Sequence, residues 1–141
     1  YGEYSKAGEF VYDHPFQWGS KRTGPDLARI GGKYPDSWHF YHMLDPSSMA
    51  EGSIMPHYPF LFEDDLDISS TRSKIHAMRQ MGVPYPHNYE DIANDDLKKQ
   101  ATEIVKSLKS ADIEIEPSKE IISLIAYLQR LGIDIKAQDQ N

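Results

Sequence analysis

The sequence predicts a mainly α-helical domain, on the evidence of two long periodic segments and a shortage of strand patterns. Apolar residues recur every three to four positions over residues 90–110 and again over residues 117–131. That spacing is typical of helices with one buried face. Short runs of alternating apolar and polar residues, which would indicate strands, are few. A chain of 141 residues suits one domain with a modest core, so we expect a single domain over residues 1–141.

The first third of the chain predicts little regular structure. Residues 1–21 contain aromatic side chains without a period, and we expect a loop-rich wrap with one short helix near residues 4–10. Leu27 and Ile30 lie three positions apart and predict a single helical or 3₁₀ turn, which Gly31-Gly32 would end.

Residues 36–45 predict a helix that begins at Asp36 or Ser37, both good N-caps, and ends before Pro46. We expect a loop over residues 46–62. Inside it, two prolines follow the methionine in the segment Met55-Pro56-His57-Tyr58-Pro59. Because proline fixes φ and lacks an N–H, this segment suits neither a helix interior nor a central strand. A stiff loop that presents a thioether is either a core plug or a metal-ligand site.

The second half of the chain predicts three helices. Residues 71–81 form the first, with Ile75, Met78 and Met81 as apolar positions and Gly82 as its stop. Residues 90–110 form the longest. The last runs over 117–131, since proline fits the first helical position.

Composition excludes several classes of function. The net charge of −7 argues against nucleic acid as a partner, because phosphate binding needs an excess of Lys and Arg. The chain contains no cysteine, which excludes disulfides, thiolate metal sites and a cysteine nucleophile within it. No apolar run is long enough to span a membrane, and no signal peptide is visible. The first residue is Tyr1, so we expect the chain to be part of a longer protein.

Two histidines offer a different metal hypothesis. His39 and His42 lie three positions apart on one predicted helix and can share a face. With a third ligand they would form a zinc site, although the chain has no His-Glu-x-x-His motif. The alternative is that these histidines only form local hydrogen bonds.

Three motifs, in order and spacing, resemble those of class I cytochromes c. They are Gly24-Pro25-Asp26-Leu27, Met55-Pro56, and the helical segment Leu124-Ile125-Ala126-Tyr127-Leu128-Gln129-Arg130-Leu131-Gly132. The resemblance implies a class I cytochrome c-like helical fold.

A closer resemblance covers residues 13–29 and continues through Trp38-His39, Asp45-Pro46, residues 53–59 and Gly82-Val83-Pro84-Tyr85. These segments are very similar to the mono-haem cytochrome c subunit (subunit II) of cbb3-type cytochrome c oxidases. Residues 63–115 then correspond to a helical insertion before the C-terminal helix.

The chain departs from that family at its beginning. The Cys-x-x-Cys-His motif, which attaches haem and supplies the proximal histidine, lies just before the equivalent of Tyr1 in the family. The membrane anchor and the N-terminal helix are also absent from these residues. We therefore expect a soluble, N-terminally truncated fragment that carries no haem and is inactive alone.

For the intact subunit, the resemblance implies electron transfer in a terminal respiratory oxidase. A haem c would receive electrons from a donor cytochrome and pass them towards the catalytic subunit, where oxygen is reduced. The implied partners are the catalytic and di-haem cytochrome c subunits. The implied location is the periplasmic side of the bacterial inner membrane, with an anchor outside this chain.

The resemblance also implies roles for individual residues. Met55 would be the axial ligand of the haem iron, and the Pro25 carbonyl would orient the proximal histidine. Arg22 and Arg29 would neutralise haem propionates. Trp38 and Tyr58 would form walls of the haem pocket. The alternative is a haem-free helical interaction domain on a cytochrome scaffold.

The truncation predicts how the last helix packs. Its apolar face has lost the N-terminal helix of the cytochrome fold, and exposing a few hundred Å² of apolar surface costs several kcal/mol at about 25 cal/mol per Å². We expect Ile121, Ile125 and Leu128 to be covered by a rearranged segment of the chain or by a second chain in a homodimer.

Overall fold

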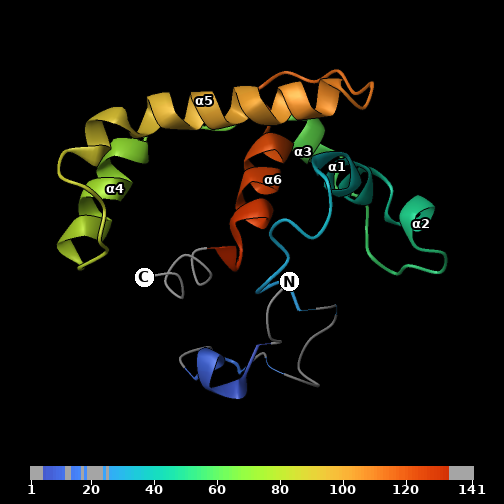
Figure 1. Ribbon diagram of the computed structural model, residues 1–141, viewed down its shortest axis with the longest axis horizontal. Helices are drawn as coiled ribbons and strands as arrows, with labels where there is room; N and C mark the ends of the chain where they lie inside the picture. Colours follow the sequence, from blue (N-terminus) through green and yellow to red (C-terminus); the bar gives the residue numbers. More distant parts are fainter. Residues whose placement is uncertain (1–4, 12–13, 17, 19–23, 25, 134–141) are drawn as a thin grey trace. The chain divides into compact units, whose positions relative to one another are not determined.

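The computed structural model describes residues 5–11, 14–16, 18, 24 and 26–133. Within them the chain forms helices and no named strand, so the mainly α prediction is confirmed. In order, the elements are a 3₁₀ helix, η1 (Ala7–Phe10), and the α-helices α1 (Asp36–Leu44), α2 (Pro46–Met49), α3 (Phe60–Glu63), α4 (Thr71–Gln80), α5 (Tyr89–Lys109) and α6 (Glu120–Arg130) (Figure 1).

The chain divides into two compact units. Unit 1 consists of Tyr1–Pro35 together with Tyr127–Asn141, and unit 2 consists of Asp36–Ala126. Helix α6 begins in unit 2 and ends in unit 1.

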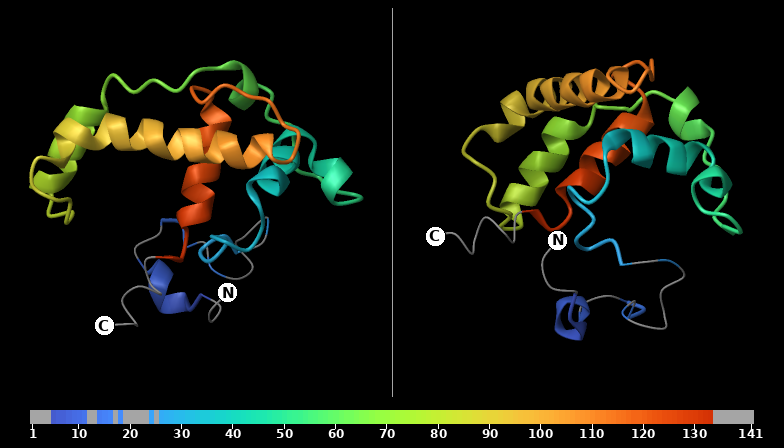
Figure 2. Two further views of the ribbon diagram at one scale, coloured as in Figure 1. Left: turned by 45° about the horizontal axis from the view of Figure 1, so that its top comes forward. Right: turned by 45° about the vertical axis from the view of Figure 1, so that its right-hand side comes forward.

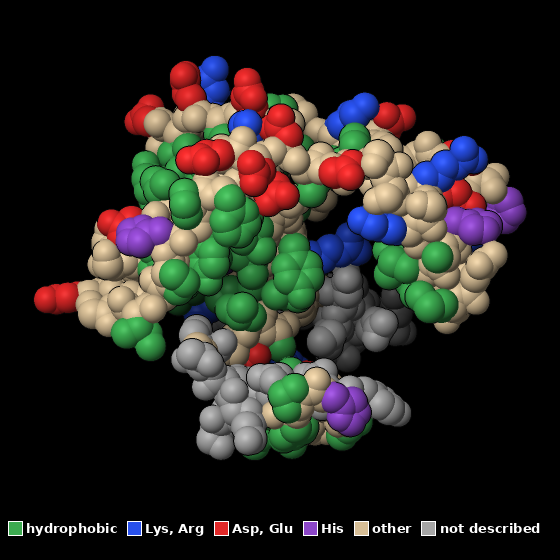
Figure 3. All heavy atoms as spheres, turned by 180° about the vertical axis from the view of Figure 1, so that it is seen from behind, with side chains coloured by type: hydrophobic (Ala, Val, Ile, Leu, Met, Phe, Trp, Pro, Cys, Tyr) green, Lys and Arg blue, Asp and Glu red, His purple; other side chains and the backbone are tan. Residues whose placement is uncertain are grey.

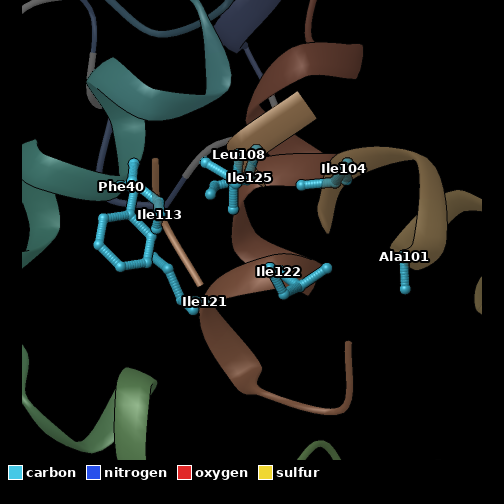
Figure 4. Packing of buried hydrophobic residues seen from close by; sticks show 8 residues of the cluster. All are labelled: Phe40, Ala101, Ile104, Leu108, Ile113, Ile121, Ile122 and Ile125. Atoms are coloured by element: carbon cyan, nitrogen blue, oxygen red, sulfur yellow. The ribbon is translucent and has the colours of Figure 1, made fainter. Parts of the chain in front are cut away.

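The core of unit 2 is built between α1, α5, α6 and the segment that joins α5 to α6. Its buried members are all aliphatic except for one phenylalanine: Phe40, Ala101, Ile104, Leu108, Ile113, Ile121, Ile122 and Ile125 (Figure 4). Full burial of one such side chain contributes about 1.5–3 kcal/mol. The C-terminal half of α5 therefore supplies the main hydrophobic partner of α6.

The expectation for the apolar face of the last helix is confirmed. Ile121 and Ile125 are fully buried, and Leu128 is also buried. In unit 2 the cover comes from the same chain, through α5 and Phe40.

Helix α4 packs beside the first half of α5 (Figures 1 and 2). Only Ile75 of α4 is buried, and an ion pair between Arg79 and Glu90, with an N–O distance of 2.7 Å, links the two helices. The helices predicted over residues 71–81 and 90–110 are thus confirmed to within one residue at each end. Met81, expected on the apolar face, is instead 77% exposed, because α4 ends one residue before it.

The last helix starts later than expected. The prediction placed Pro117 at its first position, but α6 begins at Glu120. The residues in between form an antiparallel bridge with an earlier segment: the Leu66 N–H donates to the Ser118 carbonyl at 2.8 Å, and the Glu120 N–H donates to the Asp64 carbonyl at 3.1 Å. This pairing keeps residues 117–119 out of the helix.

In unit 1, Gln129 fixes the turn segment against the end of α6. Its side-chain amide accepts from the Gly32 N–H at 3.0 Å and donates to the Tyr34 carbonyl at 2.9 Å. Beside it, the Gly31 N–H donates to the Leu131 carbonyl at 3.0 Å. A Cβ at Gly31 would lie 2.4 Å from the Gln129 carbonyl oxygen, so only glycine permits this close approach.

The early turns agree with their predictions. The Ile30 N–H donates to the Leu27 carbonyl at 3.1 Å, which forms the expected single turn. The short helix expected near residues 4–10 is a 3₁₀ helix, η1. Among the described residues, no helix combines the length and apolar character that a membrane span requires.

Candidate functional site

The segment that carries Met55 is shorter than expected. The loop predicted over residues 46–62 has a helix at each end, α2 and α3, which leaves residues 50–59 as the connection. Pro46, expected to stop α1, also begins α2. Asp45 caps it, because its carboxylate accepts from the backbone N–H groups of Ser47 and Ser48 at 3.1 and 3.3 Å. Proline suits the first helical position, where its missing donor costs nothing.

Residues 53–58, in the middle of the segment, belong to no helix or strand, as expected of a loop. Met55 is half-buried, and its N–H donates to the Ser53 hydroxyl at 3.3 Å. Pro56 and Pro59 have no N–H and therefore restrict the backbone on either side of Tyr58. The thioether is thus carried on a stiff connection between two short helices.

Two hydrogen bonds tie this connection to the C-terminal end of α1. The Tyr58 N–H donates to the Met43 carbonyl at 3.3 Å. The His57 imidazole lies with Nδ1 2.9 Å from the Leu44 carbonyl oxygen. A carbonyl oxygen can only accept, so Nδ1 carries the hydrogen. Both carbonyls lie in the last turn of α1, where no intrahelical donor remains for them.

Trp38 lies on the same helix as these carbonyls. Its ring stacks on His42, with centroids 4.5 Å apart and planes at 12°, and meets the His39 ring edge-on at 5.3 Å. Burial lowers the pKa of both histidines, so they are neutral at pH 7. Nδ1 of His42 is buried and has no hydrogen-bond partner among the described residues.

The surface next to this site is apolar. Tyr41 and Leu44 of α1 and Phe60 of α3 are all more than 40% exposed. Figure 3 shows hydrophobic side chains gathered below α5 on the side of α1. An exposed apolar surface of this kind suits a hydrophobic ligand or a partner protein.

Arg29, in unit 1, has one nitrogen in an ion pair and another unused. Nη2 lies 3.1 Å from the Glu9 carboxylate, and this bond lowers the pKa of Glu9. The side chain is only 19% exposed, and Nη1 is buried without a hydrogen-bond partner in the described part of the chain. A buried guanidinium nitrogen in this state suits a second carboxylate.

The predicted site residues do not all lie in one unit, and two of them lie outside the described residues. Arg22 and Pro25 lie outside the described residues. Trp38 and Tyr58 lie in unit 2 with Met55, and the backbone bond from Tyr58 to α1 brings the loop to the helix that carries Trp38. Arg29 belongs to unit 1.

The zinc hypothesis gains no support. In the ranges that the structure describes, no three side chains of His, Cys, Asp or Glu form a group that could hold a metal ion. His39 and His42 instead belong to the aromatic contacts around Trp38.

Comparison with protein families decides the identity. The family model of the cytochrome c oxidase mono-haem subunit, FixO, matches residues 1–135. The chain belongs to the FixO family. A search of curated proteins found no match to it. Membership confirms the resemblance drawn from the residues, and it implies an electron-transfer role as the haem subunit of a cbb3-type oxidase.

Two side chains of this chain, each taken by itself, suit a haem c group. Thioether attachment requires cysteine, and none of the 141 residues is cysteine, so these residues alone cannot attach haem c covalently. The sulfur of Met55, in unit 2, is a donor that suits haem iron. The unpartnered Nη1 of Arg29, in unit 1, suits a propionate.

Proposed function

We propose that this chain forms the methionine side of a haem c pocket in the electron-transfer subunit of a cbb3-type oxidase. One observation carries the proposal: Met55 lies on a proline-bounded connection that is hydrogen-bonded to the end of the helix that carries Trp38. A fixed thioether is what an axial ligand requires, because each free rotor would have to be ordered on binding.

The haem, when bound, supplies a one-electron carrier. Met55 would bind its iron, and a thioether ligand would favour the ferrous state and raise the potential. Trp38 and Tyr58 would exclude water from the iron. Arg29 would neutralise a propionate through Nη1, and Arg22 would do the same at a second one.

Pro25 has a supporting role in the proposal. Its carbonyl would accept from Nδ1 of the proximal histidine and so fix the orientation of that ring. The histidine and the attaching cysteines come from outside these 141 residues, since no cysteine is present within them.

The proposed electron path runs from a donor cytochrome through this subunit to the catalytic subunit. The partners are therefore the catalytic and di-haem cytochrome c subunits. The domain lies on the periplasmic side of the inner membrane and is held there by a segment outside this chain. The isolated 141-residue chain, which has no cysteine to attach it, carries no haem.

The test compares spectra and potentials of the full-length subunit with Met55→Leu and with the control Met81→Leu, which changes a 77% exposed side chain. We expect low-spin haem in the wild type and the control. Met55→Leu should become high-spin, bind carbon monoxide and lower the potential. A Met55→Leu subunit that keeps the wild-type spectrum and potential would refute the assignment.

The absence of cysteine from the chain also favours a second function, a haem-free helical interaction domain. Haem staining of the denatured full-length subunit separates the two. Covalently retained haem supports the electron-transfer assignment, and a subunit without it supports the interaction domain.

A further inference from the structure

We infer that His57 is a positioning residue for Met55, acting through its hydrogen bond to the carbonyl oxygen of Leu44. This inference rests on the proposed axial role of Met55 and names the side chain that holds its loop in place. His57 itself touches neither the iron nor a substrate.

Backbone hydrogen-bond donors are scarce near Met55. Pro56 and Pro59 lack an N–H, so few groups of this segment can bond to neighbouring elements. The Tyr58 N–H uses one such opportunity, at 3.3 Å from the Met43 carbonyl. The imidazole of His57 supplies the second anchor, and at 2.9 Å it is the shorter of the two.

The acceptor makes this anchor effective. Leu44 is the last residue of α1, and its carbonyl lies at the negative end of the helix dipole, where a donor is favoured. The two bonds engage consecutive carbonyls of α1, those of Met43 and Leu44. They therefore fix the direction of the chain as well as its distance from the helix.

The consequence concerns how often Met55 leaves its position. His57 is exposed, so water replaces its hydrogen bond when the loop opens. A bond of this kind shifts such an opening equilibrium about three- to tenfold. Without it, the loop opens more often and the iron becomes accessible to added ligands.

The experiment uses the full-length haem-loaded subunit with three variants. His57→Phe removes the donor, and His57→Asn keeps a side-chain donor near the same place. His87→Phe is the matched control, because His87 is also an exposed loop histidine. The measurements are the rate of cyanide binding to the ferric subunit and the hydrogen-exchange rate of the Tyr58 amide.

We expect both rates to rise about three- to tenfold in His57→Phe, to return towards wild type in His57→Asn, and to stay unchanged in His87→Phe. Equal rates in His57→Phe and wild type would overturn the inference. An increase that His57→Asn does not reverse would also overturn it, since the hydrogen bond would then not be the cause.

The tautomer of His57 gives an independent check. Nitrogen-15 NMR should show the hydrogen on Nδ1, as the contact with a carbonyl requires, and an Nε2–H tautomer would contradict the inference. Failure of the proposed function has a different signature. If Met55→Leu leaves cyanide binding unchanged, Met55 is not the ligand, whereas the tautomer and the Tyr58 exchange rate still report the anchor.

Discussion

Replacement of Leu108 by alanine tests the packing on which unit 2 depends. Leu108 lies on α5, is fully buried and belongs to the same cluster as Ile121 and Ile125 of α6. Its truncation removes the transfer free energy of the lost atoms and leaves a cavity between the two helices. Buried Leu→Ala changes cost about 3–4 kcal/mol for both effects together, which is a large part of a typical stability of about 5–15 kcal/mol.

The assay is urea unfolding followed by far-ultraviolet circular dichroism. With a slope of about 2 kcal/mol per M, Leu108→Ala should lower the unfolding midpoint by more than about 1 M. Ile92→Ala is the matched control, because Ile92 lies on the same helix but is 51% exposed, and it should cost less than about 1 kcal/mol. A loss for Leu108→Ala no larger than that of the control would refute the α5–α6 core.

Three further predictions concern other parts of the chain. Gly31→Ala should cost about 2 kcal/mol or more in thermal unfolding, since its Cβ would lie 2.4 Å from a backbone carbonyl oxygen at the end of α6, whereas Gly8→Ala meets nothing within 4 Å and should be nearly neutral. Burial lowers the pKa of His39, so the unfolded chain binds the proton first, and stability should fall as the pH drops below about 6.5; His39→Gln should flatten this slope, and an unchanged slope would contradict the assignment. The Lys119 side chain, 3.0 Å from the Asp65 carboxylate, lowers the pKa of Asp65, which adds stability above the ordinary aspartate pKa that is lost as pH falls. Lys119→Met should raise the pKa of Asp65 in an NMR titration and have only a small effect on stability, because the Asp65 carboxylate is exposed to solvent.

The longest helices were predictable from the sequence because their apolar spacing is local information. The stripe over residues 90–110 matches α5. The apolar spacing did not show which of these positions would be buried, since Ile92 is exposed while Ala93 beside it is buried. Which positions are buried depends on where α4 and α6 contact α5, and that is decided by tertiary packing.

Element ends were less predictable, because distant residues decide them. The start of α6 moves from Pro117 to Glu120 because the intervening residues pair with residues 64–66. Pro46 was expected only to end the first helix, but it also begins α2. Asp45, directly before it, caps α2 with two hydrogen bonds and was the local signal for this second helix.

At the site, the sequence predicted the candidate ligand but not its support. The two prolines that follow Met55 indicated a loop, and the structure has a connection without helix or strand there. The role of His57 depends on a carbonyl thirteen residues earlier, which no local pattern reveals. The only sequence signal was a histidine that lies between two prolines.

The central claim is that the sulfur of Met55 binds the haem iron, and methyl NMR tests it most directly. In the full-length ferrous subunit labelled with carbon-13 at its methionine methyl groups, ring currents of the haem shift the methyl of an axial methionine far upfield. This chain contains five methionines. We predict one strongly shifted methyl signal that Met55→Leu removes and Met81→Leu leaves in place. A spectrum without such a signal, or one whose shifted signal survives Met55→Leu, would contradict it.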